Sequence, residues 1–317
     1  MYTFGEITTK VALIAQRSGD TDYLTKIKDW VNLGHQFVAN SYDFWSELQA
    51  EYTFASVAST EKYYLPSDFD KPYRLFDFTN NRKLQWTTRE EYVSSNISSV
   101  SSANTGSPQY AMLYGISAVA SIISSSSTIK VKSSNTNDNS GIIIRVEGWL
   151  DSAKTILGYE DITISTSDPT TYTSGSVSFY GLTTVTKSAD TTGFVTIANS
   201  ASTVLATISP YDRQSRYPIL YLGLIPVGAY TYNMLYKRKV KKLVSDYDYP
   251  FMNCSDFLIL YAVAYAFQQE KESESRAQAF WTKANEQLML LMRNEQNKMG
   301  SDFQHKFIPK TNQSHRS

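Results

Sequence analysis

The sequence predicts an α+β fold, in which an α-helical bundle core with short β-hairpins from both chain ends carries an inserted immunoglobulin-like β-sandwich. Three observations lead to this prediction. The first ~50 residues show helical apolar spacing, and so does the segment Ser255–Lys298. The segment Ile116–Ser209 contains a Ser/Thr-rich series of short alternating strands with polar turns. The two ends can build one helical core only if the middle loops out as a separate β module.

These patterns divide the chain into four parts. Residues 1–118 and 213–298 are expected to form the two parts of the core, the second with strands and two helices. Residues 119–212 are expected to form the inserted β-sandwich domain, and residues 299–317 a flexible C-terminal tail. A chain of 317 residues is long enough for two domains, and an apolar fraction of 42% is enough to build their cores.

Two helices are predicted near the N-terminus. Thr8 or Thr9 can cap a short helix, and Asp20 or Thr21 can cap the next one. The second helix carries an apolar stripe that is expected to pack in the core. Apolar pairs repeat along it every seven residues, as Trp30/Val31, Phe37/Val38 and Phe44/Trp45.

Patterns of period two run through the middle of the chain. Ile129 and Val131 alternate with lysines, and Ile144 and Val146 share one face of the next predicted strand. Turn signals such as Ser167-Asp168-Pro169 separate the strands. Roughly seven short strands at this spacing are typical of a β-sandwich. The module has no cysteine pair, which excludes a disulfide-bearing antibody-type domain.

Charge and cysteine content limit the possible partners and compartment. The formal net charge is zero and the isoelectric point is near 6.8, so long-range attraction to nucleic acid or to anionic membranes does not organise this protein. The single cysteine, Cys254, cannot form an intrachain disulfide and fits a reducing cytoplasm. The N-terminus does not resemble a signal peptide, and no apolar run is long enough to cross a bilayer. We expect a soluble protein made in the host cytoplasm.

The sequence lacks the motifs of common enzyme classes, metal sites and cofactor sites. It has no P-loop, no GxGxxG and no HExxH. The histidines are His35, His305 and His315; we expect His35 at the surface or an interface, and no metal site. The acids Glu90 and Glu91 fit the first turn of a helix capped by Thr87 or Thr88 better than a catalytic pair. We therefore expect no enzyme, no cofactor and no bound metal.

Four aspartates of the predicted module carry ligand atoms that suit calcium. They lack the spacing of a calcium loop, so roles in forming turns are favoured. These residues are Asp138, Asp151, Asp161 and Asp168.

Three motifs give the two ends a resemblance to the head-to-tail adaptor (head-completion, connector) proteins of tailed bacteriophages. Lys62-Tyr63-Tyr64-Leu65-Pro66-Ser67-Asp68 is similar to the aromatic–Leu-Pro–x–Asp turn of that family. Gly106-Ser107-Pro108-Gln109-Tyr110 is similar to its Gly-x-Pro–x-Tyr turn before a strand. The series from Leu222 through Tyr236-Lys237-Arg238 and Asp246-Tyr247-Asp248-Tyr249-Pro250 resembles its strand–strand–helix–helix ending. The predicted β insert departs from the minimal family pattern and resembles the extra domains of some adaptors.

The resemblance implies a structural virion protein of the neck, located where the head joins the tail. Such adaptors form a homo-oligomeric ring, commonly of twelve subunits, beneath the portal. The ring extends the DNA channel and joins the portal protein to the tail or nozzle protein during tail assembly. The content of 23 tyrosines and 15 phenylalanines suits a protein with subunit interfaces, although a Tyr-rich β protein would also account for it.

The C-terminal tail is a candidate partner-binding segment. In the family that the chain resembles, this segment often grips the portal. Spaced apolar residues in a polar tail suit ordering on a partner surface, and the alternative is a plain disordered terminus. The apolar residues are Phe303, Phe307 and Ile308.

The concentrated basic patch of the sequence lies just after a predicted strand. Its cations are expected to face passing DNA or acidic portal residues, with contacts to phosphates that do not depend on sequence. The alternative is a solvated strand end. The residues are Lys237, Arg238, Lys239, Lys241 and Lys242.

A second function belongs to another class of protein. The β-sandwich can be a virion-surface or tail binding module that recognises a host glycan, with exposed aromatic rings stacking on sugars. The candidate rings are Trp149, Tyr159, Tyr172 and Tyr180. At least half of them are expected in the sandwich core or in an interface instead.

Overall fold

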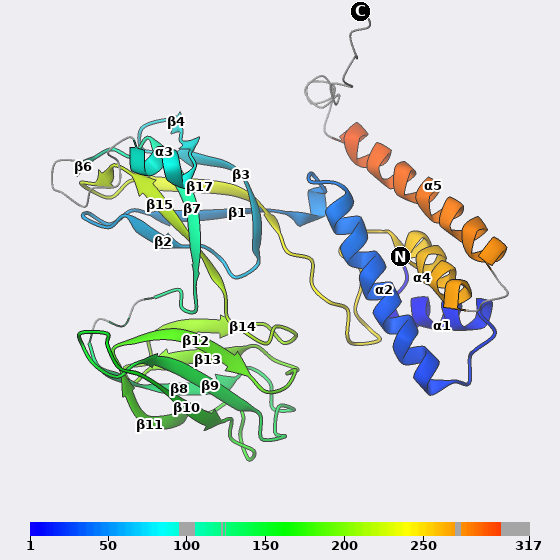
Figure 1. The fold of residues 1–317 in the computed structure, drawn as a ribbon, viewed down its shortest axis with the longest axis horizontal. Helices are drawn as coiled ribbons and strands as arrows, with labels where there is room; N and C mark the ends of the chain where they lie inside the picture. The colour runs from blue at the N-terminus through cyan, green and yellow to red at the C-terminus, as the bar shows by residue number, and fades with distance from the viewer. Residues whose placement is uncertain (95–104, 122, 124, 270–273, 299–317) are drawn as a thin grey trace, which may run out of the picture. The chain divides into compact units, whose positions relative to one another are not determined.

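The computed structural model describes residues 1–94, 105–121, 123, 125–269 and 274–298 (Figure 1). The chain forms two compact units, which we call the helical unit and the sheet unit. The helical unit comprises residues 1–49 and 240–317, and the sheet unit comprises residues 50–239.

Four helices from opposite ends of the sequence make the helical unit. They are α1 (Phe4–Ile14), α2 (Thr21–Ser41), α4 (Ser255–Gln269) and α5 (Glu274–Lys298). The helices lie side by side and share one apolar cluster, so neither pair would bury its apolar face alone (Figure 1). The cluster includes Phe4, Ile7, Val11, Ile27, Val31, Val38, Leu258, Ala262, Ala284 and Leu288.

Helix α1 begins earlier than the sequence predicts. Thr3 is the N-cap, and it forms a capping box with Glu6: the Glu6 N–H donates to Thr3 Oγ1 at 3.2 Å, and the Thr3 N–H donates to Glu6 Oε2 at 2.8 Å. The prediction of a cap at Thr8 or Thr9 is wrong, because both hydroxyls donate to the Gly5 carbonyl from inside the helix. The Thr-x-x-Glu spacing was the local signal for the true start.

Helix α2 begins as predicted and ends sooner. Asp20 caps it by accepting from the Tyr23 N–H at 3.0 Å. The predicted third pair, Phe44/Trp45, lies outside the helix, because Tyr42 is extended. Trp45 is fully buried, and its indole N–H donates to the Val38 carbonyl at 2.7 Å. The ring thus satisfies a carbonyl that the end of the helix leaves without a backbone partner.

Two four-stranded sheets form one part of the sheet unit. The first has the order β1-β17-β3-β4, and the second has the order β2-β15-β7-β5. The strands of the first are β1 (Gln49–Ala55), β17 (Thr231–Arg238), β3 (Phe69–Asp77) and β4 (Arg82–Lys83). The strands of the second are β2 (Lys62–Tyr64), β15 (Tyr217–Gly223), β7 (Tyr110–Ser117) and β5 (Gln85–Trp86).

Smaller elements complete this part. The strands β6 (Thr105–Gly106) and β16 (Ile225–Pro226) pair in parallel. The 3-10 turn η1 (Ser46–Leu48) lies in the helical unit, just before β1. The predicted capped helical turn is α3 (Arg89–Ser94), where the Glu91 N–H donates to Thr88 Oγ1 at 3.2 Å.

The predicted α-helical bundle core with short hairpins is wrong. More of the described residues lie in strands than in helices; the strands form five sheets, and the α-helices of the described residues are α1–α5. The strands near both chain ends pair with one another, since β17 lies between β1 and β3. The two four-stranded sheets then share their own apolar cluster, which does not depend on the helices. This cluster includes Leu65, Leu75, Leu84, Leu220, Leu222, Tyr232 and Met234.

Seven strands between residues 127 and 208 form two further sheets, with the orders β10-β9-β12 and β11-β8-β13-β14. Their bounds are β8 (Ser127–Ser133), β9 (Ile143–Trp149), β10 (Leu157–Thr163), β11 (Thr173–Phe179), β12 (Gly181–Lys187), β13 (Val195–Asn199) and β14 (Val204–Ile208). Both sheets contribute to one apolar cluster, with Ile129, Val131, Ile144, Val146, Phe179, Val185 and Ile197 among its buried members.

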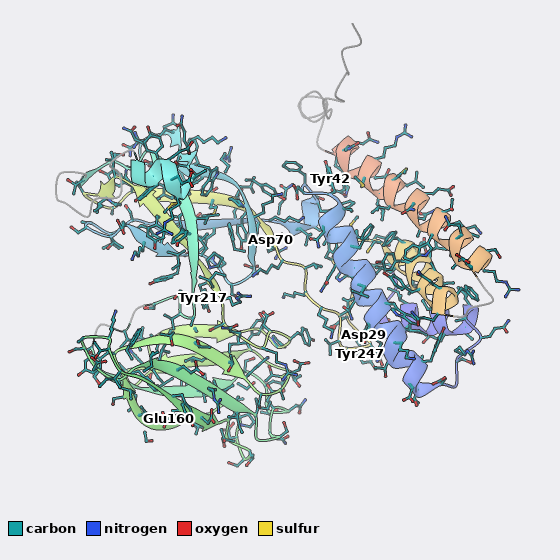
Figure 2. All side chains as sticks on the ribbon, viewed as in Figure 1. Asp29, Tyr42, Asp70, Glu160, Tyr217 and Tyr247 are labelled. Atoms are coloured by element: carbon teal, nitrogen blue, oxygen red, sulfur yellow. The ribbon has the colours of Figure 1, made fainter. Side chains whose placement is uncertain are left out.

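The chain enters and leaves these strands through β7 and β15, which are antiparallel partners with Ser117 opposite Tyr217. The segments that link β7 and β15 to these strands also form backbone hydrogen bonds with them. The Ala120 N–H donates to the Leu205 carbonyl at 2.7 Å, and the Ser215 N–H donates to the Val185 carbonyl at 3.1 Å. Tyr217, which is labelled in Figure 2, is the first residue of β15. Its hydroxyl accepts from the Thr207 N–H at 2.7 Å.

Candidate functional site

The predicted basic run is divided between the two units. Lys237 and Arg238 end β17, and the Lys239 N–H donates to the Asp68 carbonyl at 2.7 Å in the sheet unit. Lys241 and Lys242 belong to the helical unit, in the segment that leads to α4. The strand β17 positions the cations of the sheet unit, and the segment before α4 positions those of the helical unit. The five cations therefore do not form one binding site within either unit.

Burial separates these cations into two kinds. Lys237 is 2% exposed and lies opposite Lys71 on the neighbouring strand β3, so its ammonium cannot reach a phosphate without a rearrangement. The other four side chains are exposed. Their charge is therefore available to a polyanion or to acidic side chains of a partner. These four are Arg238, Lys239, Lys241 and Lys242.

The predicted portal-binding residues Phe303, Phe307 and Ile308 lie outside the described residues. Their role therefore stays a prediction from the sequence.

The four aromatic side chains named for glycan binding all keep surface exposure. Tyr159 is 63% exposed, and Trp149, Tyr172 and Tyr180 are half-buried. None of them belongs to an apolar core cluster of the described residues. The core therefore holds none of the four rings, and the other expected place, an interface, stays a prediction. Cationic side chains partly cover two of the rings. Arg145 Cζ lies 4.8 Å from the centre of the Tyr159 ring, and Lys132 Nζ lies 4.6 Å from the centre of the Tyr172 ring.

Three of the four aspartates in this region hold turns, as predicted. Asp151 accepts from the Ile156 N–H at 2.7 Å, and Asp168 from the hydroxyls of Thr170 and Thr171 at 2.6 Å each. Asp138 accepts from the Thr192 and Gly193 N–H groups at 2.6 and 3.0 Å. Burial acts to raise the pKa of Asp138, but these bonds and one from Ser133 outweigh it, so the pKa lies below its usual range.

Asp161 differs from the other three aspartates, because it lies within β10 and pairs with Arg145 on β9. Arg145 Nε and Nη2 each donate to one carboxylate oxygen at 2.8 Å. This ion pair lowers the pKa of Asp161. Each of the four carboxylates is thus engaged with groups of the chain. Among the residues that the structure describes, no group of three or more His, Cys, Asp and Glu side chains could hold a metal ion.

His35 is buried in the helical unit and is not at the surface of the chain, which corrects the prediction. Its Nε2 accepts from the Phe251 N–H at 3.0 Å, so the neutral imidazole carries its proton on Nδ1. Desolvation lowers the pKa of His35 to about 4, against a smaller opposing effect of the Lys241 backbone. The sequence showed only that His35 lies on a helix, so the contact with Phe251 had no local signal.

Cys254 is also buried, and burial raises the pKa of its thiol to about 12. The thiolate that a nucleophile or a metal ligand needs is therefore scarce at neutral pH. Glu91 caps α3 by accepting from the Thr88 N–H at 3.1 Å, which accounts for one member of the acidic pair Glu90/Glu91.

Two comparisons with known proteins bear on these observations. Residues 2–126 match the family described as SU10 adaptor protein. The match covers α1 and α2 of the helical unit and β1–β7 of the sheet unit, and it ends one residue before β8 begins. No curated protein matches the chain. In the described part of the chain, no helix is both long enough and apolar enough to cross a membrane.

Proposed function

We propose that this chain, whose residues 2–126 match the family described as SU10 adaptor protein, is a phage head-to-tail adaptor that forms a ring beneath the portal in the virion neck. The ring extends the DNA channel and joins the portal protein to the tail or nozzle protein. Such an adaptor is a structural protein, and its family is not a class of enzymes. The family match over the N-terminal part of both units is the observation that carries this proposal.

A ring of identical subunits, commonly twelve in the family that the chain resembles, is consistent with the composition of the chain. Ring closure needs one surface of each subunit to contact a different surface of the next, and repetition lets each contact be modest. The described surface offers apolar side chains on several elements, which suit such contacts. Examples are Leu13 on α1, Leu33 and Phe37 on α2, and Met289 on α5.

Contact with packaged DNA is the second part of the proposal. Four exposed cations of the basic run can pair with phosphates, and this contact would not depend on DNA sequence. The same cations can pair with acidic side chains of the portal. If the four cations only face solvent, replacing them would leave DNA retention unchanged. A change in DNA retention would therefore exclude the solvated strand end.

We also propose that residues 119–212 are an insertion between the adaptor parts 1–118 and 213–298. Two facts support this: the family match stops at residue 126, and the strands β8–β14 share an apolar cluster of their own. The antiparallel partners β7 and β15 form the entry and the exit. Residues 299–317 are proposed to be the segment that binds the portal through Phe303, Phe307 and Ile308.

The exposure of Tyr159 favours a second candidate function, which is recognition of a host glycan by the proposed insertion. An exposed aromatic ring near an arginine and an aspartate can stack on a sugar while the charged groups accept or donate hydrogen bonds. This function would add to an adaptor role or, if the ring proposal fails, replace it.

The test mixes the purified chain with the purified portal protein of the same virus and examines the product by negative-stain electron microscopy. We expect rings of this chain bound to one end of the portal. A chain that ignores the portal yet binds host cells would contradict the adaptor ring and support glycan recognition. A monomer before the portal is added decides nothing, because assembly can require the portal surface.

A further inference from the structure

The last turns of α5 carry a buried acid. Met292 still packs partly against the apolar cluster of the helical unit. Of the six described residues that follow it, Glu295 alone is buried, at 1% exposure, and the other five are exposed. Apolar packing therefore holds α5 only as far as Met292, and the end of the helix needs another attachment.

Ser46, the first residue of η1, provides that attachment. Its N–H donates to Glu295 Oε2 at 3.1 Å. Its hydroxyl lies 2.9 Å from the same oxygen and 2.9 Å from Glu47 Oε2, so the one hydroxyl proton serves one of these oxygens at a time. These contacts hold the end of α5 beside the segment that follows α2, across 249 positions of sequence (Figure 1).

Lys298, the last residue of α5, completes the arrangement. Its ammonium donates to Glu295 Oε1 and lies 3.4 Å from Glu47 Oε1. Burial acts to raise the pKa of Glu295, but the bonds from Lys298 and Ser46 outweigh it, so the pKa lies below its usual range. The carboxylate is therefore ionised at neutral pH, with both oxygens engaged. We call Ser46, Glu47, Glu295 and Lys298 the α5 clasp.

An acid at this position does not favour the helix itself. The C-terminal end of a helix carries partial negative charge, so a carboxylate there is disfavoured and a lysine is favoured. Glu295 nevertheless lies in the last turn, three positions before Lys298. Its stabilising contacts outside the helix are those with Ser46. The clasp is therefore a tertiary attachment between α5 and η1.

We propose that the clasp positions the portal-binding segment: it fixes the point at which residues 299–317 leave the helical unit, and it thereby raises the affinity of that segment for the portal protein. The segment begins at the residue after Lys298, and Phe303 is the first of its three apolar residues. This inference rests on the proposed portal-binding role of residues 299–317. It adds the residues of the helical unit that hold the start of the segment.

The gain in affinity follows from the length of chain between the helical unit and Phe303. Once the rest of the subunit is held at the portal, binding of the segment is an intramolecular step. Its effective concentration falls roughly as the −3/2 power of the length of a flexible linker. With the clasp closed, about 5 residues separate Lys298 from Phe303; with the clasp open, about 11 separate Met292 from Phe303. The effective concentration should then fall about 3-fold.

The test compares E295A with the matched control E286A, which removes a carboxylate from an exposed position of α5. Hydrogen exchange of the amides of residues 293–298 reports on the clasp directly, and we expect it to be at least about 10-fold faster in E295A and unchanged in E286A. Binding to the purified portal protein, measured by interferometry, should weaken about 3-fold in E295A and stay unchanged in E286A.

A second variant inserts six glycine and serine residues after Lys298. It lengthens the linker by the same amount and leaves the clasp residues in place. We expect the same loss of portal affinity as in E295A, together with wild-type exchange of residues 293–298. Circular dichroism checks that E295A is folded, and the insertion tests the length effect even if it is not.

The positioning role is overturned if exchange in E295A matches that of the wild-type chain, or if E295A or the insertion leaves portal affinity unchanged. E295A should cause no further loss of affinity in a chain whose Phe303, Phe307 and Ile308 are replaced by serine. A further loss there would show that the clasp acts by another route. Failure of the proposed function is distinct, because the triple serine replacement would then leave portal affinity unchanged.

Discussion

Asn32 on α2 and Leu243, which follows the basic run, form a reciprocal pair of hydrogen bonds. Asn32 Nδ2 donates to the Leu243 carbonyl at 2.9 Å, and the Leu243 N–H donates to Asn32 Oδ1 at 2.8 Å. Both residues are buried. The amide side chain thus replaces a backbone partner and holds the segment 240–243 against α2, across 211 positions of sequence.

The substitution N32A should destabilise the protein strongly. It leaves one buried N–H and one buried carbonyl of Leu243 without their partner, and the expected loss in the free energy of unfolding is about 2–4 kcal/mol. Urea titration followed by circular dichroism measures it. The matched control is N285A, which makes the same change at an exposed position of α5 and should alter stability by less than about 0.5 kcal/mol. Equal losses in the free energy of unfolding for the two variants would mean that the hydrogen bonds of Asn32 with Leu243 do not stabilise the fold.

His35 should make the helical unit sensitive to acid. Its pKa is about 4 in the folded chain, against 6.5 for an ordinary solvated histidine, so the unfolded chain binds a proton between these values and the folded chain does not. Stability is full above pH 6.5 and is lost as the pH falls toward 4, by an amount on the order of 3 kcal/mol.

The variant H35Q isolates this contribution. Glutamine can accept from the Phe251 N–H and does not titrate, so the stability of H35Q should change less between pH 6.5 and 4 than that of the wild-type chain. Urea midpoints measured for both chains at several pH values check this. Parallel curves for the two chains would assign the acid sensitivity to other groups.

Neutralising the exposed cations of the basic run should reduce DNA retention without unfolding the subunit. The variant carries R238Q, K239Q, K241Q and K242Q. Because each phosphate contact releases counterions, we expect assembled particles of this variant to lose DNA at lower salt than wild type. The readout is the DNA content of purified particles across a salt series.

A control for this experiment removes the same charge at four other exposed lysines, with K26Q, K83Q, K154Q and K283Q. We expect this variant to retain DNA like the wild-type chain. Retention that is unchanged in the first variant would remove the DNA role of the run, and equal loss in both would indicate a general effect of net charge.

Replacing Phe303, Phe307 and Ile308 together by serine should weaken binding to the portal. Apolar side chains that become buried on a partner contribute about 1.5–3 kcal/mol each, so the triple change should lower affinity by at least about 100-fold. Binding of the purified variant to the portal protein is measured by interferometry. A variant with Gln304, Asn312 and Gln313 replaced by alanine serves as the control. Equal affinity of the wild-type chain and both variants for the portal protein would show that these apolar residues do not bind it.

Local sequence signals determined those elements whose causes lie within a few residues. Asp20 marked the start of α2 because its carboxylate reaches an N–H only three positions away. The alternation at Ile129 and Val131 predicted β8 because successive strand residues point to opposite faces. The motif turns near Pro66 and Pro108 likewise indicated the adaptor family, which the match over residues 2–126 supports.

The tertiary structure alone decided how these elements combine. Strand β17 pairs with β3 across more than 150 positions, with Tyr232 opposite Asp77, and this turns the expected hairpins into two sheets with their own core. The burial of Lys237 and His35 and the exposure of Tyr247 follow from packing against distant segments. Periodicity and capping arise from neighbours along the chain, whereas pairing and burial depend on which remote surfaces meet, and no local spacing encodes that choice.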